Sequence, residues 1–249
     1  MTTVKNIYDY INSIAPFASQ EEWDNSGHLI GEFRKEVKKC VLALDGTKEV
    51  CAFARDVQAD LLLTHHPVIF GGISDVKSDS HVFILVNSGI SAISAHTNYD
   101  IAQGGINDAL AEILGLKNTV HNDGELIVTG ELDSPMSIDD FALYVESKLN
   151  VSGIRYTDTD KLIKKVAVGG GACEDYIFDA LEEADCFITG DMKYHKMLDA
   201  YEEGATVISA GHFETENLPF LMLKDKLEKV FTDVEFIIAP VENPIKTTD

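Results

Sequence analysis

The stretch LLLTHHPVIFGG, residues 61–72, places two adjacent histidines directly after an apolar run. On a regular strand neighbouring side chains point to opposite faces, so His65 and His66 could not share one ligand there. At the end of a strand the chain can turn, and Pro67 favours an extended or turning conformation just before it. Two rings could then reach one cavity or two metal ions; alternatively, one ring packs in the core and the other is solvated.

Apolar strand-like segments alternate with helical segments on both sides of this stretch. In the first half of the chain, strands are expected at 38–46, 61–66 and 90–100, and helices or buried segments at 47–60, 81–89 and 104–116. The second half runs through the same order, with strands at 164–172, 186–195, 205–216 and 233–240 and helices at 174–185, 196–204 and 217–231. This alternation predicts an α/β fold with mostly parallel sheets.

The two halves share a sequence signature at corresponding places. The segments ISAHTNYD (93–100) and ISAGHFETE (208–216) have the same first three letters and follow the same order of elements. We therefore predict a duplicated α/β unit, with a first half at 1–120 and a second at 121–249. The region from about 120 to 160 reads as an α+β bridge within the second half.

Polar side chains gather after the predicted strands. In open α/β sheets, sites form outside the carboxyl ends of the strands, where the loops converge. Five of the eight histidines follow a strand, and the exceptions are His28, His81 and His121. The strand-end residues are Asp45 and Gly46, His65 and His66, His96 to Asp100, Gly169 to Gly171, Gly190 to His195, and His212 to Glu216.

The side chains at these ends suit metal binding. Four histidines (His65, His66, His96, His212) offer imidazole nitrogens, while Asp100 and Glu216 offer oxygens. Mixed imidazole and carboxylate shells favour zinc, iron, manganese or nickel over calcium or magnesium. The pairs His96/Asp100 and His212/Glu216 are each four residues apart, a spacing that shares one face of a helical turn and in a loop is compatible with convergence.

Each of these segments also has a structural interpretation. Residues 96–100 could form an ordinary turn, with Asn98 and Asp100 bonding the local backbone. Glu216 could interact with the positive N-terminus of the following helix, whose first turn accepts Pro219. This role is compatible with binding a metal ion.

Two further segments are open to more than one interpretation. Gly169 to Gly171 lacks the spacing of a phosphate-binding loop, so a tight strand-to-helix turn is the better interpretation. Asp191, Lys193, Tyr194 and His195 could support the site from outside the ligand shell or form a helix cap and a solvated face. Lys193 could hold a phosphate or be structural.

Composition limits the partners and the cellular compartment that we expect for this protein. The 249 residues carry a net charge of −22, which disfavours nucleic acid and anionic membranes as partners and favours cations. The four cysteines lack CxxC spacing and are expected to be buried thiols in a reducing compartment. No signal peptide and no apolar run of about 20 residues is evident, so we expect a soluble, cytoplasmic protein.

Five segments, in this order, resemble the NIF-three-like family, often labelled GTP cyclohydrolase I type 2 homologs. They are EEWDNSGHLIG (21–31), LLLTHHPVIF (61–70), SAHTNYD (94–100), ITGDMKYH (188–195) and GHFETE (211–216). The resemblance implies two intertwined, duplicated α/β domains with a dinuclear metal site between them, and assembly into a toroidal homohexamer. It implies as metal ligands His65, His66, Asp100, His212 and Glu216. His96 is implied to lie near the metals, either ligating or hydrogen-bonded.

Our leading hypothesis is a dinuclear metal-dependent hydrolase, cyclohydrolase-like by resemblance. Two divalent ions about 3.5–4 Å apart would supply a hydroxide that attacks a nucleotide-type substrate. His96 and His195 are candidate proton donors to a departing nitrogen by residue type and placement. The alternative is a non-catalytic metal carrier or ring-shaped scaffold; a third reading, a nucleic-acid ring, is disfavoured by the negative charge.

Overall fold

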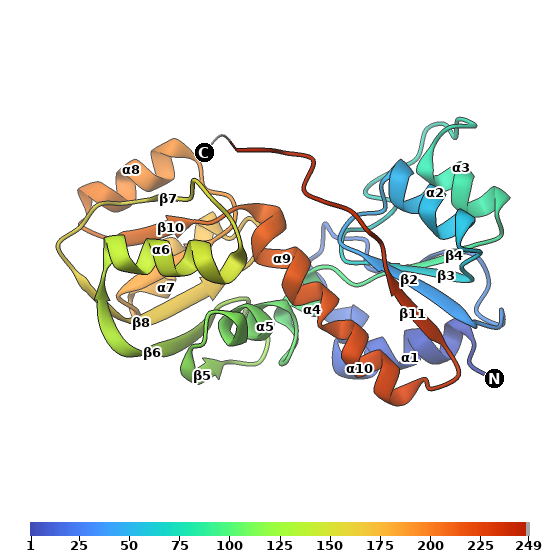
Figure 1. Ribbon diagram of the computed structural model, residues 1–249, viewed down its shortest axis with the longest axis horizontal. Helices are drawn as coiled ribbons and strands as arrows, with labels where there is room; N and C mark the ends of the chain where they lie inside the picture. Colours follow the sequence, from blue (N-terminus) through green and yellow to red (C-terminus); the bar gives the residue numbers. More distant parts are fainter. Residues whose placement is uncertain (248–249) are drawn as a thin grey trace. The chain divides into compact units, whose positions relative to one another are not determined.

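The computed structural model describes residues 1–247, and the chain forms two compact units (Figure 1). Unit 1 comprises residues 1–102 and 220–242, and unit 2 comprises residues 103–219 and 243–247. The chain thus passes from unit 1 to unit 2, back to unit 1 at residue 220 and again to unit 2 at residue 243. The predicted division at 120/121 stays a prediction, because units defined by contacts do not test which segments fold independently.

Unit 1 contains a five-stranded sheet in the order β1-β4-β3-β2-β11. The strands are β1 (Gly27–Ile30), β2 (Lys39–Ala43), β3 (Leu61–Thr64), β4 (Ser91–Ser94) and β11 (Glu235–Ile238). All neighbours pair in parallel except β1, which is antiparallel to β4. Every residue of β3 and β4 is buried, as expected for central parallel strands covered on both faces.

Helices cover both faces of this sheet. The helices α2 (Lys48–Asp56) and α3 (His81–Asn87) lie on one face, and α1 (Val4–Ile14) and α10 (Leu223–Val230) lie on the other (Figure 1). Helix α2 begins where the Thr47 side chain accepts a hydrogen bond from the Val50 amide. It buries Val50, Cys51 and Ala54 against the sheet. A short helix, α4 (Thr97–Ile101), follows β4 directly.

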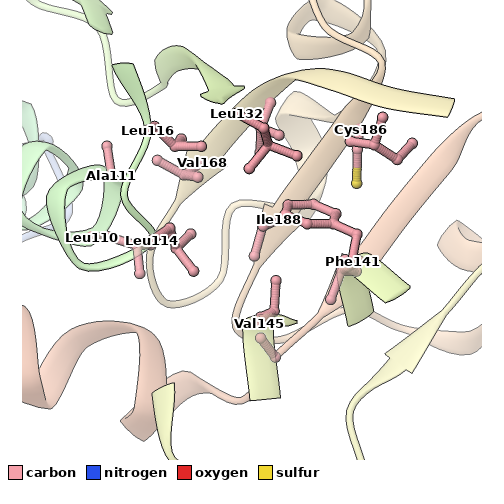
Figure 2. Close-up of a cluster of buried hydrophobic side chains, with 14 of the residues drawn as sticks. Leu110, Ala111, Leu114, Leu116, Leu132, Phe141, Val145, Val168, Cys186 and Ile188 are labelled. Atoms are coloured by element: carbon pink, nitrogen blue, oxygen red, sulfur yellow. The ribbon is translucent and has the colours of Figure 1, made fainter. Parts of the chain in front are cut away.

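Unit 2 contains a six-stranded sheet in the order β5-β6-β8-β9-β10-β7. Its strands are β5 (Lys117–His121), β6 (Val128–Ser137), β7 (Arg155–Tyr156), β8 (Leu162–Gly169), β9 (Cys186–Thr189) and β10 (Thr206–Ser209). Its helices are α5 (Ile106–Ile113), α6 (Ile138–Leu149), α7 (Ile177–Leu181), α8 (Tyr194–Glu202) and most of α9 (His212–Leu221). On one face of the sheet, Leu110 of α5 and Phe141 of α6 pack in a cluster with Val168 and Ile188 (Figure 2).

The fold class predicted from the sequence is confirmed, with one difference in pairing. The strands β8, β9 and β10 are parallel, but the pairs β5–β6, β6–β8 and β10–β7 are antiparallel. The mostly parallel pairing expected for both sheets therefore holds for unit 1 and only for the centre of the sheet in unit 2. The added strands come from the bridge region, where a short loop joins β5 to β6 and no crossover helix is needed.

The duplication is visible in the register of the central strands. In unit 1, Thr64 at the end of β3 pairs with Ser94 of β4, and in unit 2 Thr189 of β9 pairs with Ser209 of β10. One residue further on, the Ala95 amide donates to the Thr64 carbonyl at 2.9 Å, and the Ala210 amide donates to the Thr189 carbonyl at 2.8 Å. The residues that follow these strands therefore occupy corresponding positions in the two units.

Two expectations from composition can be compared with the structure. Cys40, Cys51, Cys173 and Cys186 are all buried thiols, as predicted. Among residues 1–247, no helix combines the length and the hydropathy needed to cross a membrane.

Candidate metal centre

Three histidines meet at the carboxyl ends of β3 and β4 in unit 1. His65 and His66 follow β3, and His96 follows β4 as the residue before helix α4. Their ring centroids lie 5.1 Å (His65–His66), 5.1 Å (His65–His96) and 5.4 Å (His66–His96) apart. One ligand nitrogen from each ring lies within 4.8 Å of the others, so these side chains could hold a metal ion.

Asp100 joins this cluster because residues 97–101 are helical. The Asp100 amide donates to the His96 carbonyl at 3.1 Å, and the Asp100 Oδ1 lies 3.5 Å from the His65 Nε2. Of the two interpretations of the four-residue spacing, the helical turn is correct; the predicted strand instead ends at Ser94.

Unit 2 carries the other two predicted ligands, His212 and Glu216. His212 is the first residue of α9, and Glu216 lies one turn later. The His212 Nε2 lies 3.1 Å from the Glu216 Oε2, and Glu216 is buried. The helix again brings together two residues spaced by four, so the predicted strand at 205–216 ends early, at Ser209.

All four histidines share one hydrogen-bond arrangement. Each Nδ1 lies 2.7–2.8 Å from an oxygen: His65 from the Ala95 carbonyl, His66 from Asp45, His96 from Asp24 and His212 from Asp191. Because carbonyl and carboxylate oxygens accept, each Nδ1 carries the hydrogen, and the lone pair of the neutral ring is on Nε2. This is how histidines that bind metals through Nε2 are held.

The donor set fits a divalent transition metal. The Nε2 atoms of His65 and His212 each lie close to a carboxylate oxygen, of Asp100 and Glu216 respectively. A lone pair facing a carboxylate is repulsive unless a proton or a cation lies between them. Nitrogen and oxygen donors together favour zinc, iron, manganese or nickel over the harder calcium and magnesium ions.

Asp24 is the most deeply held of these oxygen partners. Its side chain is fully buried and accepts hydrogen bonds from the Ser26 hydroxyl, from the His96 ring and from both the amide and the hydroxyl of Thr97. Burial acts to raise the pKa of Asp24, but these hydrogen bonds outweigh it and hold the pKa far below its usual value. Asp24 is therefore a fixed anion that orients His96 and the start of α4.

Gly171 makes room for Glu216 in unit 2. Its φ is +65°, and a Cβ at this position would lie 2.0 Å from the Glu216 Oε1 and 3.3 Å from the His212 Nε2. The Gly171 carbonyl also accepts a hydrogen bond from the Asp191 amide at 2.8 Å. The glycine run thus forms a tight connection after β8, as predicted. Because Gly171 has no side chain, Glu216 can occupy its observed position.

The other predicted site residues lie apart from these clusters. His195 is exposed at the start of α8 with its ring edge-on to Tyr194, and no metal-capable group found in residues 1–247 includes it. Its catalytic role stays a prediction. The Lys193 Nζ lies 2.6 Å from the Glu174 Oε1, and the Lys193 amide also donates to Glu174. Of the two interpretations of Lys193, this contact favours the structural one.

The sequence alone does not reveal the role of Asp24, although Asp24 lies in segment 21–31, which carries part of the family resemblance. Asp24 lies 72 positions before its partner His96, so no local spacing links them. Asp45 is among the strand-end residues that the sequence identifies. The sequence also allows Asp191 to support the site from outside the ligand shell, and its hydrogen bond to His212 agrees with that role.

Two α/β units with histidine and carboxylate clusters at their strand ends define a class of α/β protein suited to metal binding. Residues 2–244 match the family model Duf34/NIF3 (NGG1p interacting factor 3). The chain therefore belongs to this family, as the resemblance indicated.

Relatives and solved structures agree with this assignment. The chain is 35% identical to the "GTP cyclohydrolase 1 type 2 homolog" of Clostridium perfringens, over 95% of both chains, and 34% identical to that of Campylobacter jejuni, over 98% of both. Among solved structures, a Staphylococcus aureus protein matches with a TM-score of 0.93 and 26% identity over 99% of both chains. Reduced HcgD from Methanocaldococcus jannaschii matches with a TM-score of 0.83 and 30% identity over 96% of this chain and 98% of that chain.

Proposed function

We propose that this chain holds two divalent transition-metal ions with His65, His66 and Asp100 of unit 1 and His212 and Glu216 of unit 2. The observation that carries this proposal is the shared Nδ1 arrangement, because in a neutral ring whose Nδ1 carries the hydrogen, Nε2 is the nitrogen that can bind a metal. The number of ions and their sharing by residues of both units are parts of the proposal.

We further propose that the protein is a hydrolase of the cyclohydrolase type acting on a nucleotide-type substrate. Support comes from the ligand set and from the name that its relatives carry. Divalent ions bound here would supply a Lewis acid and lower the pKa of a water molecule toward neutrality.

Within this proposal, His96 transfers a proton to the departing nitrogen. Its Nδ1–H is fixed on Asp24, so its Nε2 can accept and return a proton while the buried carboxylate stabilises the charged ring. His195 is the second candidate for this proton transfer. Because it is exposed at the start of α8, it could act only on a substrate that extends to this helix.

Metal content and turnover together test this proposal. Protein loaded with zinc or manganese should open the ring of GTP or another nucleotide, and Glu216→Gln should weaken metal binding by about 100-fold or more, beyond the usual cost of a change outside the ligand shell. Glu214→Gln, two residues earlier in α9, is the matched control and should retain both metal and turnover.

The metal content of single and double variants tests whether the two units share the same ions. If the ligands from both units hold the same ions, His66→Ala and Glu216→Gln should each lower the total metal content, and the double variant should lose little more than either. Additive losses would contradict sharing. Full metal loading without turnover across nucleotides and phosphate esters would support the alternative, a metal carrier or scaffold.

The predicted toroidal homohexamer also belongs to this proposal. Light scattering on the purified chain should give six times the 27.3 kDa of one copy. A monomer at all concentrations would contradict it.

A further inference from the structure

Two large aromatic side chains are mostly exposed beside the histidine cluster of unit 1. Trp23 is 62% exposed and Phe70 is 60% exposed. Their ring centroids lie 6.0 Å apart with the planes inclined at 57°, and each ring meets the ring of His96 edge-on, at 5.8 and 6.1 Å. Because the two rings are tilted and not stacked, neither covers the face of the other.

The backbone that carries these rings is fixed by polar contacts. Asp24, next to Trp23, is buried and bonded to His96 and Thr97. Asn25 donates through its Nδ2 to the Ile69 carbonyl at 2.7 Å, immediately before Phe70. Residues 23–25 therefore present the Trp23 ring, hold the ring of His96 and fix the backbone next to Phe70.

This combination points to a ligand surface. Exposed aromatic rings on a flexible loop would be unremarkable, but rings kept exposed on a fixed backbone beside candidate ligands are preorganised for contact. Trp23 and Phe70 contact His96, whose ligand nitrogen lies within 4.8 Å of those of His65 and His66. A flat molecule stacked on one of these rings and contacting the other at an angle would have its edge near the histidine cluster.

We propose that Trp23 and Phe70 form the stacking surface for a planar nitrogen heterocycle of the purine class, whose ring-edge oxygen or nitrogen faces the histidine cluster. Aromatic side chains bind the π-face of any base, and ring oxygens and nitrogens are suitable metal donors. The net charge of −22 opposes binding through phosphates, so the ring itself carries the recognition. This inference rests on the proposed metal site and specifies its substrate class.

Trp23 is the only tryptophan in the chain, so its fluorescence reports on this surface alone. Guanosine titrated into the zinc-loaded full-length protein should quench that fluorescence saturably, whereas ribose, which lacks the base, should not. Phe70→Ala, which keeps the reporter, should weaken guanosine binding about fivefold or more, the loss expected for one stacking ring. Phe178→Ala, at a position that is 50% exposed in α7 of unit 2, is the matched control and should bind guanosine as the unaltered protein does.

The zinc content of each sample separates this inference from the metal proposal. If the unaltered protein retains zinc and guanosine leaves the fluorescence unchanged, or if Phe70→Ala binds guanosine as tightly as the unaltered protein, the stacking surface is wrong and the metal site stands. If zinc is not retained, the metal proposal fails. Fluorescence that depends on protein concentration and not on guanosine would assign Trp23 to an interface between copies of the chain and overturn the inference.

Discussion

The two units use the same frame of parallel strands but place different side chains at its end. After β3 in unit 1 come His65 and His66, and at the corresponding places after β9 in unit 2 come Gly190 and Asp191. The second strand of each pair, by contrast, leads in both units into a helix with a histidine at its first residue or just before it, and a carboxylate four residues after that histidine. Both units therefore have a histidine and a carboxylate at the start of this helix, while the adjacent loop supplies imidazoles in one unit and an orienting carboxylate in the other.

The units also differ in how firmly the histidines are oriented. Asp24, the partner of His96, is fully buried, whereas Asp191, the partner of His212, has a side chain that is 64% exposed. A buried carboxylate with several hydrogen bonds contributes to folding, while an exposed one is screened by water. We therefore expect the orienting contact of unit 1 to be structural as well as functional, and that of unit 2 to be mainly functional.

Replacing these two carboxylates gives the largest expected contrast. Asp24→Asn should lower the free energy of unfolding by about 2–4 kcal/mol, because one amide NH2 would face a donor whichever way the side chain is turned. Asp191→Asn should cost under about 0.5 kcal/mol. Both should weaken zinc binding, by about 10–100-fold, Asp24→Asn because it loosens the start of α4, which carries Asp100, and Asp191→Asn because it releases His212. Urea unfolding and zinc titration measure the two effects, and an equal stability loss in both variants would contradict the contrast.

A smaller effect on stability is expected at Gly171 in unit 2. Gly171→Ala forces a side chain into a left-handed conformation, at a cost of about 1 kcal/mol, and directs a methyl group at Glu216. Gly204→Ala is the control, since its φ is +67° and a Cβ there meets nothing within 4 Å. Both variants should lose similar stability in urea, but only Gly171→Ala should lose metal. Retention of full metal content by Gly171→Ala would show that Glu216 is not a ligand.

The smallest effect concerns a histidine of unit 2 outside the metal clusters. Burial acts to lower the pKa of His121, but hydrogen bonds to Asp108 and to the Glu125 carbonyl outweigh it and raise the pKa above 6.5. Because the folded-state pKa is raised, this stabilisation is complete below the unfolded-state pKa of about 6.5 and is lost as the pH rises through the folded-state value.

The difference in unfolding free energy between the metal-free protein and His121→Asn should therefore be largest at low pH and shrink as the pH increases. Urea unfolding at several pH values measures this difference, and comparing two metal-free proteins removes the contribution of the other histidines. A difference that stayed constant, or grew with pH, would contradict the assignment.

The strand ends could be predicted from the sequence because they depend on local pattern. Apolar runs followed by histidines identify the carboxyl ends of β3, β4 and β10, and the four-residue spacing of His212 and Glu216 already contained the helical turn. The orienting oxygens are different, because Asp24 and His96 are 72 positions apart and Asp45 and His66 are 21 apart. Such pairs are set by how the strands are ordered in the sheet, which a single sequence does not specify.

The role of Gly171 is a second feature that the sequence alone does not fully predict. Its place in a run of three glycines indicated a tight turn, which the structure contains. That its missing side chain accommodates a carboxylate from α9 depends on a helix far along the chain, so only the folded unit reveals it.

The proposed metal centre requires histidines that are held at Nδ1 and bind metal through Nε2. Anomalous scattering from metal-soaked crystals, recorded at several absorption edges, tests this directly. We predict metal peaks about 2.0–2.1 Å from the Nε2 atoms of His65, His66 and His212 if the metal is zinc, with Asp100 and Glu216 also coordinated. Metal bound at Nδ1, or no peak near any of these five side chains, would contradict it.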